Sequence, residues 1–323
     1  MPAKPAVERR KISGSAHPQK TKSLLWWVLT IRPLEKDCSD AIVGNIITPL
    51  TAQARSWGVE RSSFGRFLDK DKPHVELHLL TTANAADRLW LFAHALVAQH
   101  APHLGAMDLA HVKSAAYPPP HGEVASPQIE AALSKYGGVE GIALTAEIAE
   151  VSSDLAAWAI GRFPTTNPRS ALAALLLFDA CHAMMRGPRS ALWADRRSLS
   201  WDYYWDSHLR SSTASYGPRA AQVRSTLTTA LAPRIVPAHR SMGAVASELS
   251  AENWRKRWVR AIDTYMYRAD KSRISRSAQQ LTMYQSHQLL NRLGIPLRDE
   301  AALGLYARAW SKEREEELVR TRP

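Results

Sequence analysis

The sequence carries a row of ionisable side chains in the stretch KPHVELHLL, residues 72–80. Apolar and ionisable residues alternate there, which predicts a β-strand that sends the two kinds to opposite faces. The ionisable face holds His74, Glu76 and His78, which can accept or deliver protons. Two interpretations stay open. The row is either a polar face that lies under a loop and hydrogen-bonds the backbone, or the lining of a cleft in which Glu76 acts as an acid or base.

A metal site is not expected at this row. Side chains two residues apart on a strand stand about 6.5–7 Å apart, so the outer two would be separated by roughly 13 Å. Adjacent members could share an ion, but all three could not do so without distortion. Because no further ligand cluster lies nearby in the sequence, we predict no metal.

A second candidate segment is YQSHQLLNRLGI, residues 284–295. Its leucines recur at helical spacing, and a glycine followed by a proline predicts where the helix ends. His287 and Asn291 fall one turn apart on the same face, with Ser286 and Arg292 beside them. The alternative is an amphipathic helix whose histidine is simply a satisfied interface residue.

The third candidate is the aromatic and basic segment AENWRKRWVRAIDTYMYRADKSR. Trp254, Trp258 and Tyr265 recur at helical spacing, while Arg255 and Arg257 fall on other faces. Such a stripe is typical of a buried core. The functional alternative is an apolar wall from which Tyr265 offers a hydroxyl and against which Trp254 covers a planar ligand.

Charge and composition narrow the class of protein. The 323 residues carry a net charge of +12, concentrated in residues 1–22 and 252–276, and such fields attract polyanions. No zinc-finger, RNA-reading or basic-zipper pattern accompanies the charge, so nucleic acid is not an expected partner. The two cysteines fit a reducing compartment, and no segment is long and apolar enough for a signal peptide or membrane span. We expect a cytoplasmic protein.

The elements that position these residues predict an α+β fold. We expect a small mixed β-sheet near the N-terminus packed against a mainly helical layer. Residues 1–22 are expected to be a flexible basic arm, and residues 23–323 a single catalytic domain. The expected strands are 24–32, 61–68 and 73–81; the expected helices are 40–57, 83–100, 128–135, 138–161, 168–186, 200–211, 218–231, 247–269, 274–293 and 298–319. No phosphate-binding loop, dinucleotide fingerprint, serine elbow or CxxC is present, so no cofactor is expected.

Three segments follow one another in an order that resembles a known family. They are FGRFLDKDKPHVELHLL, IEAALSKYGGVEGIALTAEIAEVSSD and SHQLLNRLG. The chain resembles the elimination-domain family of class I lantibiotic dehydratases, which includes the thiopeptide biosynthesis proteins built on the same domain. The resemblance covers most of residues 24–310 and implies the fold of that domain.

Two chemistries share this fold, and one strand separates them. Elimination enzymes of the family typically show a PHLRLR-like strand, whose arginines suit the carboxylates of a leaving glutamate. Here Glu76 and His78 stand at those positions, and a carboxylate repels glutamate. The histidine four residues before "NR" is kept as His287. The chain is therefore more similar to the thiopeptide pyridine synthases of the family.

That branch implies a cofactor-independent enzyme of thiopeptide biosynthesis. It joins two dehydroalanines of one precursor peptide by a formal (4+2) aza-cycloaddition, with loss of water and of the leader peptide. The implied partners are the precursor peptide, with its leader and its dehydroalanine and azole core, and other enzymes of a biosynthetic complex. Two alternatives remain: a lyase that eliminates glutamate from glutamylated Ser or Thr, and a non-catalytic partner that binds the leader.

The expected site combines the three candidate segments in one cleft. Strand 73–81, helix 247–269 and helix 274–293 should converge there, with Glu76, Tyr265, Ser286 and His287 as the catalytic groups. The remaining candidates should bind substrate, with the arginines attracting an acidic leader. They are His74, His78, Trp254, Trp258, Arg255, Arg257, Asn291 and Arg292.

Overall fold

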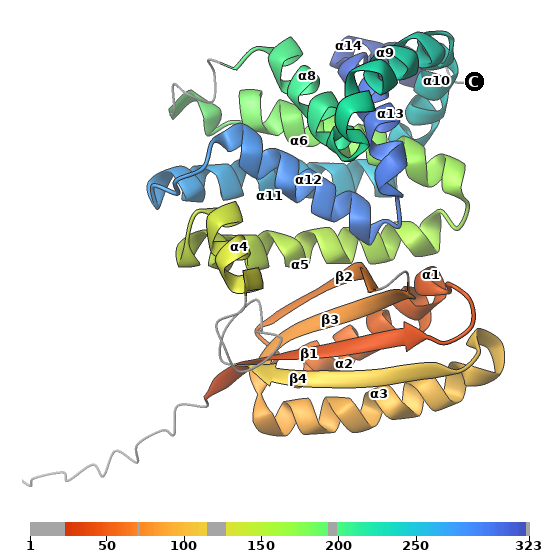
Figure 1. Ribbon diagram of the computed structural model, residues 1–323, viewed down its shortest axis with the longest axis vertical. Helices are drawn as coiled ribbons and strands as arrows, with labels where there is room; N and C mark the ends of the chain where they lie inside the picture. The colour runs from red at the N-terminus through yellow and green to blue at the C-terminus, as the bar shows by residue number, and fades with distance from the viewer. Residues whose placement is uncertain (1–22, 70–71, 115–126, 193–198, 321–323) are drawn as a thin grey trace, which may run out of the picture.

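The computed structural model describes residues 23–69, 72–114, 127–192 and 199–320. A small sheet with its own helices forms one end of the molecule, and a larger set of helices forms the other (Figure 1). The expected α+β class with a mainly helical second layer is therefore confirmed. The predicted basic arm, residues 1–22, lies outside the described residues.

The sheet has four strands in the order β2-β3-β1-β4. Their bounds are β1 (Leu24–Pro33), β2 (Arg61–Asp69), β3 (Lys72–Thr82) and β4 (Met107–Ser114). Every neighbouring pair is antiparallel, so the prediction of a mixed sheet was wrong. The chain order β-α-β-β-α-β gives a split βαβ arrangement in which β3 enters between β1 and β2. Strand β4 was not predicted, because most of its residues are exposed and it shows no clear alternation.

One face of the sheet is covered by helices that come from its own connections. They are α1 (Ser39–Ile42), the π-helical turn η1 (Val43–Ile47), α2 (Thr48–Ser56) and α3 (Ala83–Leu104). The apolar side chains Leu29, Val75, Leu77 and Leu79 point to this face and are at most 1% exposed. Because side chains alternate along a strand, the ionisable row of β3 must lie on the opposite face.

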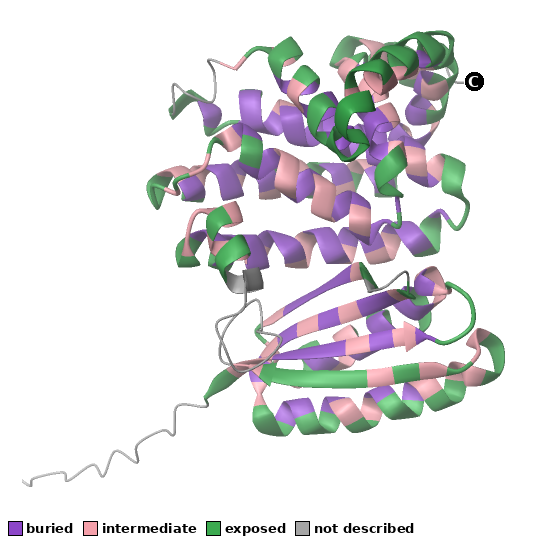
Figure 2. Cartoon of the chain, viewed as in Figure 1, coloured by how far each residue is buried: buried purple, intermediate pink, exposed green. Residues whose placement is uncertain are grey.

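The second layer is built from antiparallel and crossing helices around α6. Most residues of α6 are buried, and Figure 2 shows the buried segments running along α5, α6, α11 and α12. Among the described residues, no helix is long and apolar enough to cross a membrane. The helices are α4 (Pro127–Tyr136), α5 (Val139–Arg162), α6 (Thr166–Arg186), α8 (Trp201–Ser212), α9 (Ala220–Leu231), α10 (Ile235–Ala246), α11 (Leu249–Lys271), α12 (Ala278–Arg292), α13 (Leu297–Arg308) and α14 (Lys312–Arg320).

Two helix predictions need correction. Helix α10 was missed because Pro233 and Pro237 suggested a loop. Pro237 lies in the first turn of α10, where a missing backbone N–H costs little. The predicted helix 298–319 is divided into α13 and α14, with a break at residues 309–311.

Side chains from two helices hold the edge of β2. The backbone N–H of Phe64 donates to Oγ of Ser153 at 3.0 Å, and Nε of Arg292 donates to the Phe64 carbonyl at 2.7 Å. The side-chain amide of Asn291 bonds both the N–H and the C=O of Arg66, at 3.0 and 2.9 Å. These bonds satisfy an edge that would otherwise present unpaired backbone groups.

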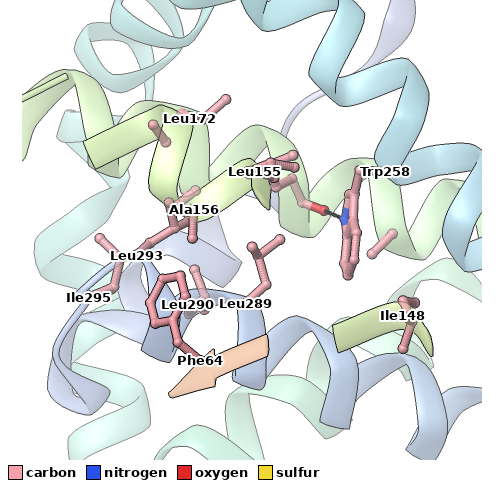
Figure 3. Packing of buried hydrophobic residues seen from close by; sticks show 14 of the residues in the cluster. Phe64, Ile148, Leu155, Ala156, Leu172, Trp258, Leu289, Leu290, Leu293 and Ile295 are labelled. Carbon is pink, nitrogen blue, oxygen red and sulfur yellow. Dashed lines mark hydrogen bonds between the residues drawn. The ribbon is translucent and has the colours of Figure 1, made fainter. Parts of the chain in front are cut away.

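The hydrophobic core continues across this junction. Figure 3 shows Phe64 of β2 against Leu289, Leu290 and Leu293 at the end of α12, with Ala156 of α5 nearby. The core therefore fixes the end of α12 relative to the sheet. This attachment decides how far His287 lies from the ionisable row of β3.

Candidate functional site

The ionisable side chains of β3 form one group, called the β3 triad below (His74, Glu76 and His78). Nε2 of His78 lies 3.1 Å from Oε2 of Glu76, and Nε2 of His74 lies 3.5 Å from Oε1. Each carboxylate oxygen therefore faces one imidazole. All three side chains are between 8% and 13% exposed, although they lie on the sheet face opposite α2 and α3.

Strand β2 shapes the space beside this triad. Its register places Gly65 opposite Glu76 and Phe67 opposite His74. The Phe67 ring stacks on the His74 ring with centres 5.6 Å apart. A Cβ at position 65 would lie 2.9 Å from Cε2 of Phe67, so glycine is what lets the ring fold back over its own strand.

The triad is suited to proton exchange rather than to holding an anion by charge. A carboxylate between two imidazoles can take up a proton from a substrate and share it with either neighbour. Nδ1 of His74 is buried and has no hydrogen-bond partner among the described residues, a costly condition that a bound ligand would relieve. Across the described residues, no three His, Cys, Asp or Glu side chains gather as ligands for a metal ion.

A second group of the same composition lies among the helices, and is called the helical triad below (His208, Glu300 and His287). Nδ1 of His287 on α12 lies 2.8 Å from Oε2 of Glu300 on α13. Nε2 of His208 on α8 lies 3.6 Å from Oε1 of the same carboxylate. The side chains of Glu300 and His208 are 8% and 4% exposed, whereas that of His287 is 42% exposed.

The environment of Glu300 keeps it ionised. Burial raises its pKa, but the hydrogen bond from His287 and the nearby imidazole of His208 outweigh burial and lower the pKa to about 2. An ionised carboxylate only accepts hydrogen bonds, so Nδ1 of a neutral His287 must carry the proton. Nε2 of His287 is then left as a base on a half-exposed ring. This arrangement orients one imidazole for acid–base work.

Ser286 does not lie in a cleft as predicted. Its side chain points into the helical layer and the residue is 2% exposed. There its hydroxyl faces the phenol of Tyr204, whose pKa is raised well above its ordinary value by burial. A buried serine in this place cannot touch a substrate in the described conformation, so the catalytic role predicted for Ser286 is not supported.

Tyr265 lies at the junction of α5, α11 and α12. Its hydroxyl lies 3.3 Å from Nε2 of Gln285 and 3.4 Å from Oγ1 of Thr145. Burial raises the pKa of Tyr265, partly offset by these two hydrogen bonds. The ring, 4% exposed, forms part of a groove between α5 and α11, while its hydroxyl bonds to α5 and α12.

Arg255 corrects the prediction of a leader-binding arginine. Its guanidinium is 4% exposed and bonds both oxygens of Asp179, at 2.7 and 2.9 Å, and both oxygens of Glu315, at 2.8 and 2.9 Å. Burial lowers the pKa of Arg255, but its two carboxylate partners outweigh it and raise the pKa overall. This side chain connects α11 to α6 and α14. Its charge is already paired with two carboxylates, so it is not available to bind a leader peptide.

The predicted aromatic wall is only partly on the surface. Trp258 is fully buried, and its Nε1 donates to the carbonyl of Leu176, so the prediction that it binds substrate was wrong. Figure 3 draws this bond as a dashed line at the Trp258 nitrogen. Trp254 is half-buried and packs on Trp158 with ring centres 5.8 Å apart. Exposed Arg257 also lies over the Trp254 ring, with the guanidinium carbon 4.1 Å from the ring centre.

Asn291 and Arg292 also have structural partners. Both were predicted to bind substrate, but they hold the backbone of Phe64 and Arg66 at the edge of β2. Strand β2 thereby connects the two triads. Asn291 lies one helical turn after His287, and Arg66 is adjacent to Gly65, which pairs with Glu76. The predicted catalytic residues therefore belong to separate hydrogen-bonded groups.

Comparisons with known proteins identify the family of the chain. Residues 26–310 match the family described as lantibiotic biosynthesis dehydratase C-term. The chain belongs to this family. A comparison with curated proteins found no match.

Solved structures share the fold of the lantibiotic dehydratase C-terminal family at low sequence identity. TsrL superposes with a TM-score of 0.60 and 14% identity, over 93% of this chain and 99% of TsrL. TbtD, a pyridine synthase from thiomuracin biosynthesis, gives 0.54 and 14%, over 88% of this chain and 96% of TbtD. MibB, a tRNA dependent lantibiotic dehydratase from Microbispora sp. 107891, gives 0.54 and 16%; 96% of this chain is covered, but only 29% of MibB.

The residues that the sequence reasoning missed belong to the helical triad. Glu300 stood in the first turn of a predicted helix, where an acidic residue is ordinary. His208 lay in the predicted helix 200–211, whose several aromatic residues fit either core packing or a lid over a cleft. Glu300 contacts both His287 and His208, and His208 comes from a helix far away in the sequence, so no local pattern could signal the group.

Proposed function

We propose that this member of the family is a thiopeptide pyridine synthase. It would hold one precursor peptide so that two dehydroalanines meet, and bringing remote groups together in this way can supply most of the acceleration. The observation that carries the proposal is the β3 triad. A carboxylate flanked by two imidazoles occupies the strand where an elimination enzyme needs cations for glutamate.

The reaction balances without a redox partner. The amide before one dehydroalanine tautomerises to its iminol, which gives a C=N–C=C unit. The second alkene adds across this unit, forming two C–C bonds and a six-membered ring that contains the amide nitrogen. Water then leaves from the former amide carbon, and the leader leaves as its carboxamide, which makes the ring aromatic.

The two triads supply the proton movements that this sequence of steps needs. The iminol tautomer requires a proton to leave nitrogen and another to reach oxygen, and Glu76 with its two imidazoles can serve both. Loss of water and of the leader amide requires an acid and a base, for which His287 is suited by its partner Glu300. Phe67 keeps water from the imidazole of His74 by stacking on it.

The test is incubation with a synthetic peptide that carries a leader and two dehydroalanines in an azole-containing core. Mass spectrometry should show a macrocycle that has lost water and the leader, together with the free leader amide. A peptide recovered at unchanged mass, although it binds the protein, would overturn the proposal and favour a leader-binding partner. Glu76→Gln serves as the matched inactive control because it keeps the shape of the side chain.

The helical triad favours one second candidate, a glutamate-elimination lyase. An oriented and half-exposed imidazole can remove the α-proton of a glutamylated serine or threonine. Incubation with a glutamylated peptide separates the two activities. Loss of glutamate with formation of a dehydroamino acid would establish the lyase and refute the cyclase.

A further inference from the structure

A groove of about 320 Å³ lies between α5 and α11. The two helices run antiparallel there, because Glu147 contacts Arg268 near one end and Trp158 contacts Trp254 near the other. Aliphatic side chains form the floor, namely Leu144, Ile148, Val151 and Ala261. Charged side chains form the rim, namely Glu147, Arg257, Arg260 and Arg268.

Some of the charged side chains on this rim have ion-pair partners and others do not. Arg268 pairs with Glu147, and Arg61 of β2 pairs with the same carboxylate at 3.3 Å. Within the described part of the chain, Arg257 and Arg260 have no carboxylate within 4.0 Å. Two guanidinium groups above an apolar floor therefore keep their full charge for a ligand.

Both free guanidinium groups are also held in place. Arg257 lies over the Trp254 ring, and Nε of Arg260 donates to the backbone carbonyl of Lys256 at 3.3 Å. Preordered side chains lose less conformational entropy when they bind. The terminal nitrogens of Arg260 remain available for a carboxylate, which a guanidinium can hold through two parallel hydrogen bonds.

We infer that this groove binds an acidic segment of the peptide substrate, with its carboxylates on Arg257 and Arg260 and an aliphatic side chain on the floor. The inference rests on the proposed function only for the peptide nature of the substrate. Arg61 shares the face of β2 that carries Gly65 and Phe67, since residues two apart on a strand point the same way. The ion pair of Arg61 with Glu147 therefore joins the groove to the sheet face that carries the β3 triad.

The lining favours an acidic peptide over a nucleic acid. The groove offers four aliphatic side chains, whereas unpaired bases are gripped by exposed aromatic rings. Glu147 on the rim repels a continuous run of phosphates but tolerates a spaced pair of carboxylates. The basic residues 1–22 of this chain carry the same sign as the groove and are not a suitable occupant.

Fluorescence anisotropy with the full-length protein tests the inference directly. The probes are a labelled peptide rich in glutamate and leucine, its glutamate-to-glutamine version and its leucine-to-serine version, with a labelled single-stranded oligonucleotide for comparison. We expect Arg257→Glu combined with Arg260→Glu to weaken binding of the acidic peptide at least about tenfold, because both contacts become repulsive. Both modified peptides should bind about tenfold more weakly than the parent.

Lys256→Glu is the matched control. Lys256 directly precedes Arg257 in the sequence, is exposed, and pairs with Glu252 outside the lining of the groove. The same charge reversal there should change binding less than about twofold, because exposed pairs contribute little. An equal loss in Lys256→Glu, or oligonucleotide binding that depends on Arg257 and Arg260 in the same way, would overturn the inference. Circular dichroism and thermal melts show that each variant is folded.

The binding result and the activity result can fail separately. Tight, groove-dependent peptide binding without any cyclised product would refute the proposed function and leave the groove assigned. Full turnover of a leader-bearing peptide by the Arg257 and Arg260 double variant, with unchanged KM, would refute the groove and leave the function.

Discussion

Two glutamates in this protein each lie between two imidazoles, yet the two groups differ in which side chain is exposed. Glu76 lies 3.1 and 3.5 Å from its histidines, and Glu300 lies 2.8 and 3.6 Å from its own. In the β3 triad all three side chains are nearly buried to a similar degree. In the helical triad the carboxylate is buried while one imidazole, His287, is 42% exposed.

The difference concerns which group can meet a substrate. Glu300 lies behind His287, so it acts by orienting that ring and keeping the proton on Nδ1. Glu76 has no half-exposed imidazole in front of it, so its carboxylate is itself the group that a substrate would reach. Under the proposed function, a similar composition would therefore give a positioning carboxylate in the helical triad and a reacting carboxylate in the β3 triad.

The largest expected effect is on stability, and it should distinguish Glu300 from Glu76. The pKa of Glu300 is lowered to about 2 in the folded protein, against 4.5 as its ordinary value. A depressed carboxyl pKa stabilises the fold above the unfolded value, and this stabilisation is lost as pH falls from 4.5 towards 2. The shift corresponds to about 3 kcal/mol. Glu300→Gln should therefore lower the free energy of unfolding by about 2–3 kcal/mol near neutral pH.

Denaturant unfolding at a series of pH values checks this prediction. The difference between the unmodified protein and Glu300→Gln should narrow as pH falls through the window from 4.5 to 2. Two stability curves that stay parallel across this window would show that the two histidines do not hold the Glu300 carboxylate in its charged form.

Glu76→Gln is expected to change chemistry instead. Loss of a group that transfers protons typically slows turnover about 100-fold, which corresponds to about 2.7 kcal/mol in the barrier. Stability should change by less than about 1 kcal/mol, because glutamine fills the same space and still bonds both histidines. Product formation by mass spectrometry and thermal melts measure the two effects. Unchanged turnover would make Glu76 a structural residue like Glu300.

The two triads also differ in how far the sequence predicted them. The β3 triad follows from alternation along one strand, so its members and their common face were predicted from local pattern. The helical triad joins three helices, and its central residue Glu300 carried no local signal. The same reason explains the errors at Arg255, Asn291 and Arg292. Each of these side chains hydrogen-bonds to residues at least sixty positions away in the sequence, and only the folded chain brings such residues together.

The element pattern was more predictable than the site. Strands β1 to β3 and helices α3, α5 and α6 follow from periodicity and from their proline and glycine boundaries. The sheet was called mixed because the order of strands depends on pairing between distant segments. Trp258 shows the same limit within one helix, since a stripe of aromatic residues does not reveal which of its members face solvent.

A glycine that packs against His208 of the helical triad gives the third prediction. A Cβ at Gly304 would lie 2.5 Å from Nδ1 of His208, whose side chain is 4% exposed. Gly304→Ala should therefore destabilise the fold by about 2 kcal/mol, as overpacking of a core does. Thermal melts measure the loss. A melting temperature at or above that of the unmodified protein would show that α8 and α13 can separate freely at this contact.

The corresponding glycine of the β3 triad should behave in the opposite way. The atoms nearest to a Cβ at Gly65 would be those of the Phe67 ring, which is 44% exposed and can swing outward. Gly65→Ala should change stability by less than about 0.5 kcal/mol, since alanine also restricts the unfolded chain.

Turnover should fall about threefold, roughly 0.6 kcal/mol, because the displaced ring no longer covers His74 and admits water beside Glu76. Phe67→Ala is the matched variant, since it removes the same cover without adding a Cβ, and it should lower turnover to a similar extent. If Gly65→Ala left turnover intact while Phe67→Ala lowered it, the ring would have kept its place over the triad, and the close approach at Gly65 would have no part in shaping the site.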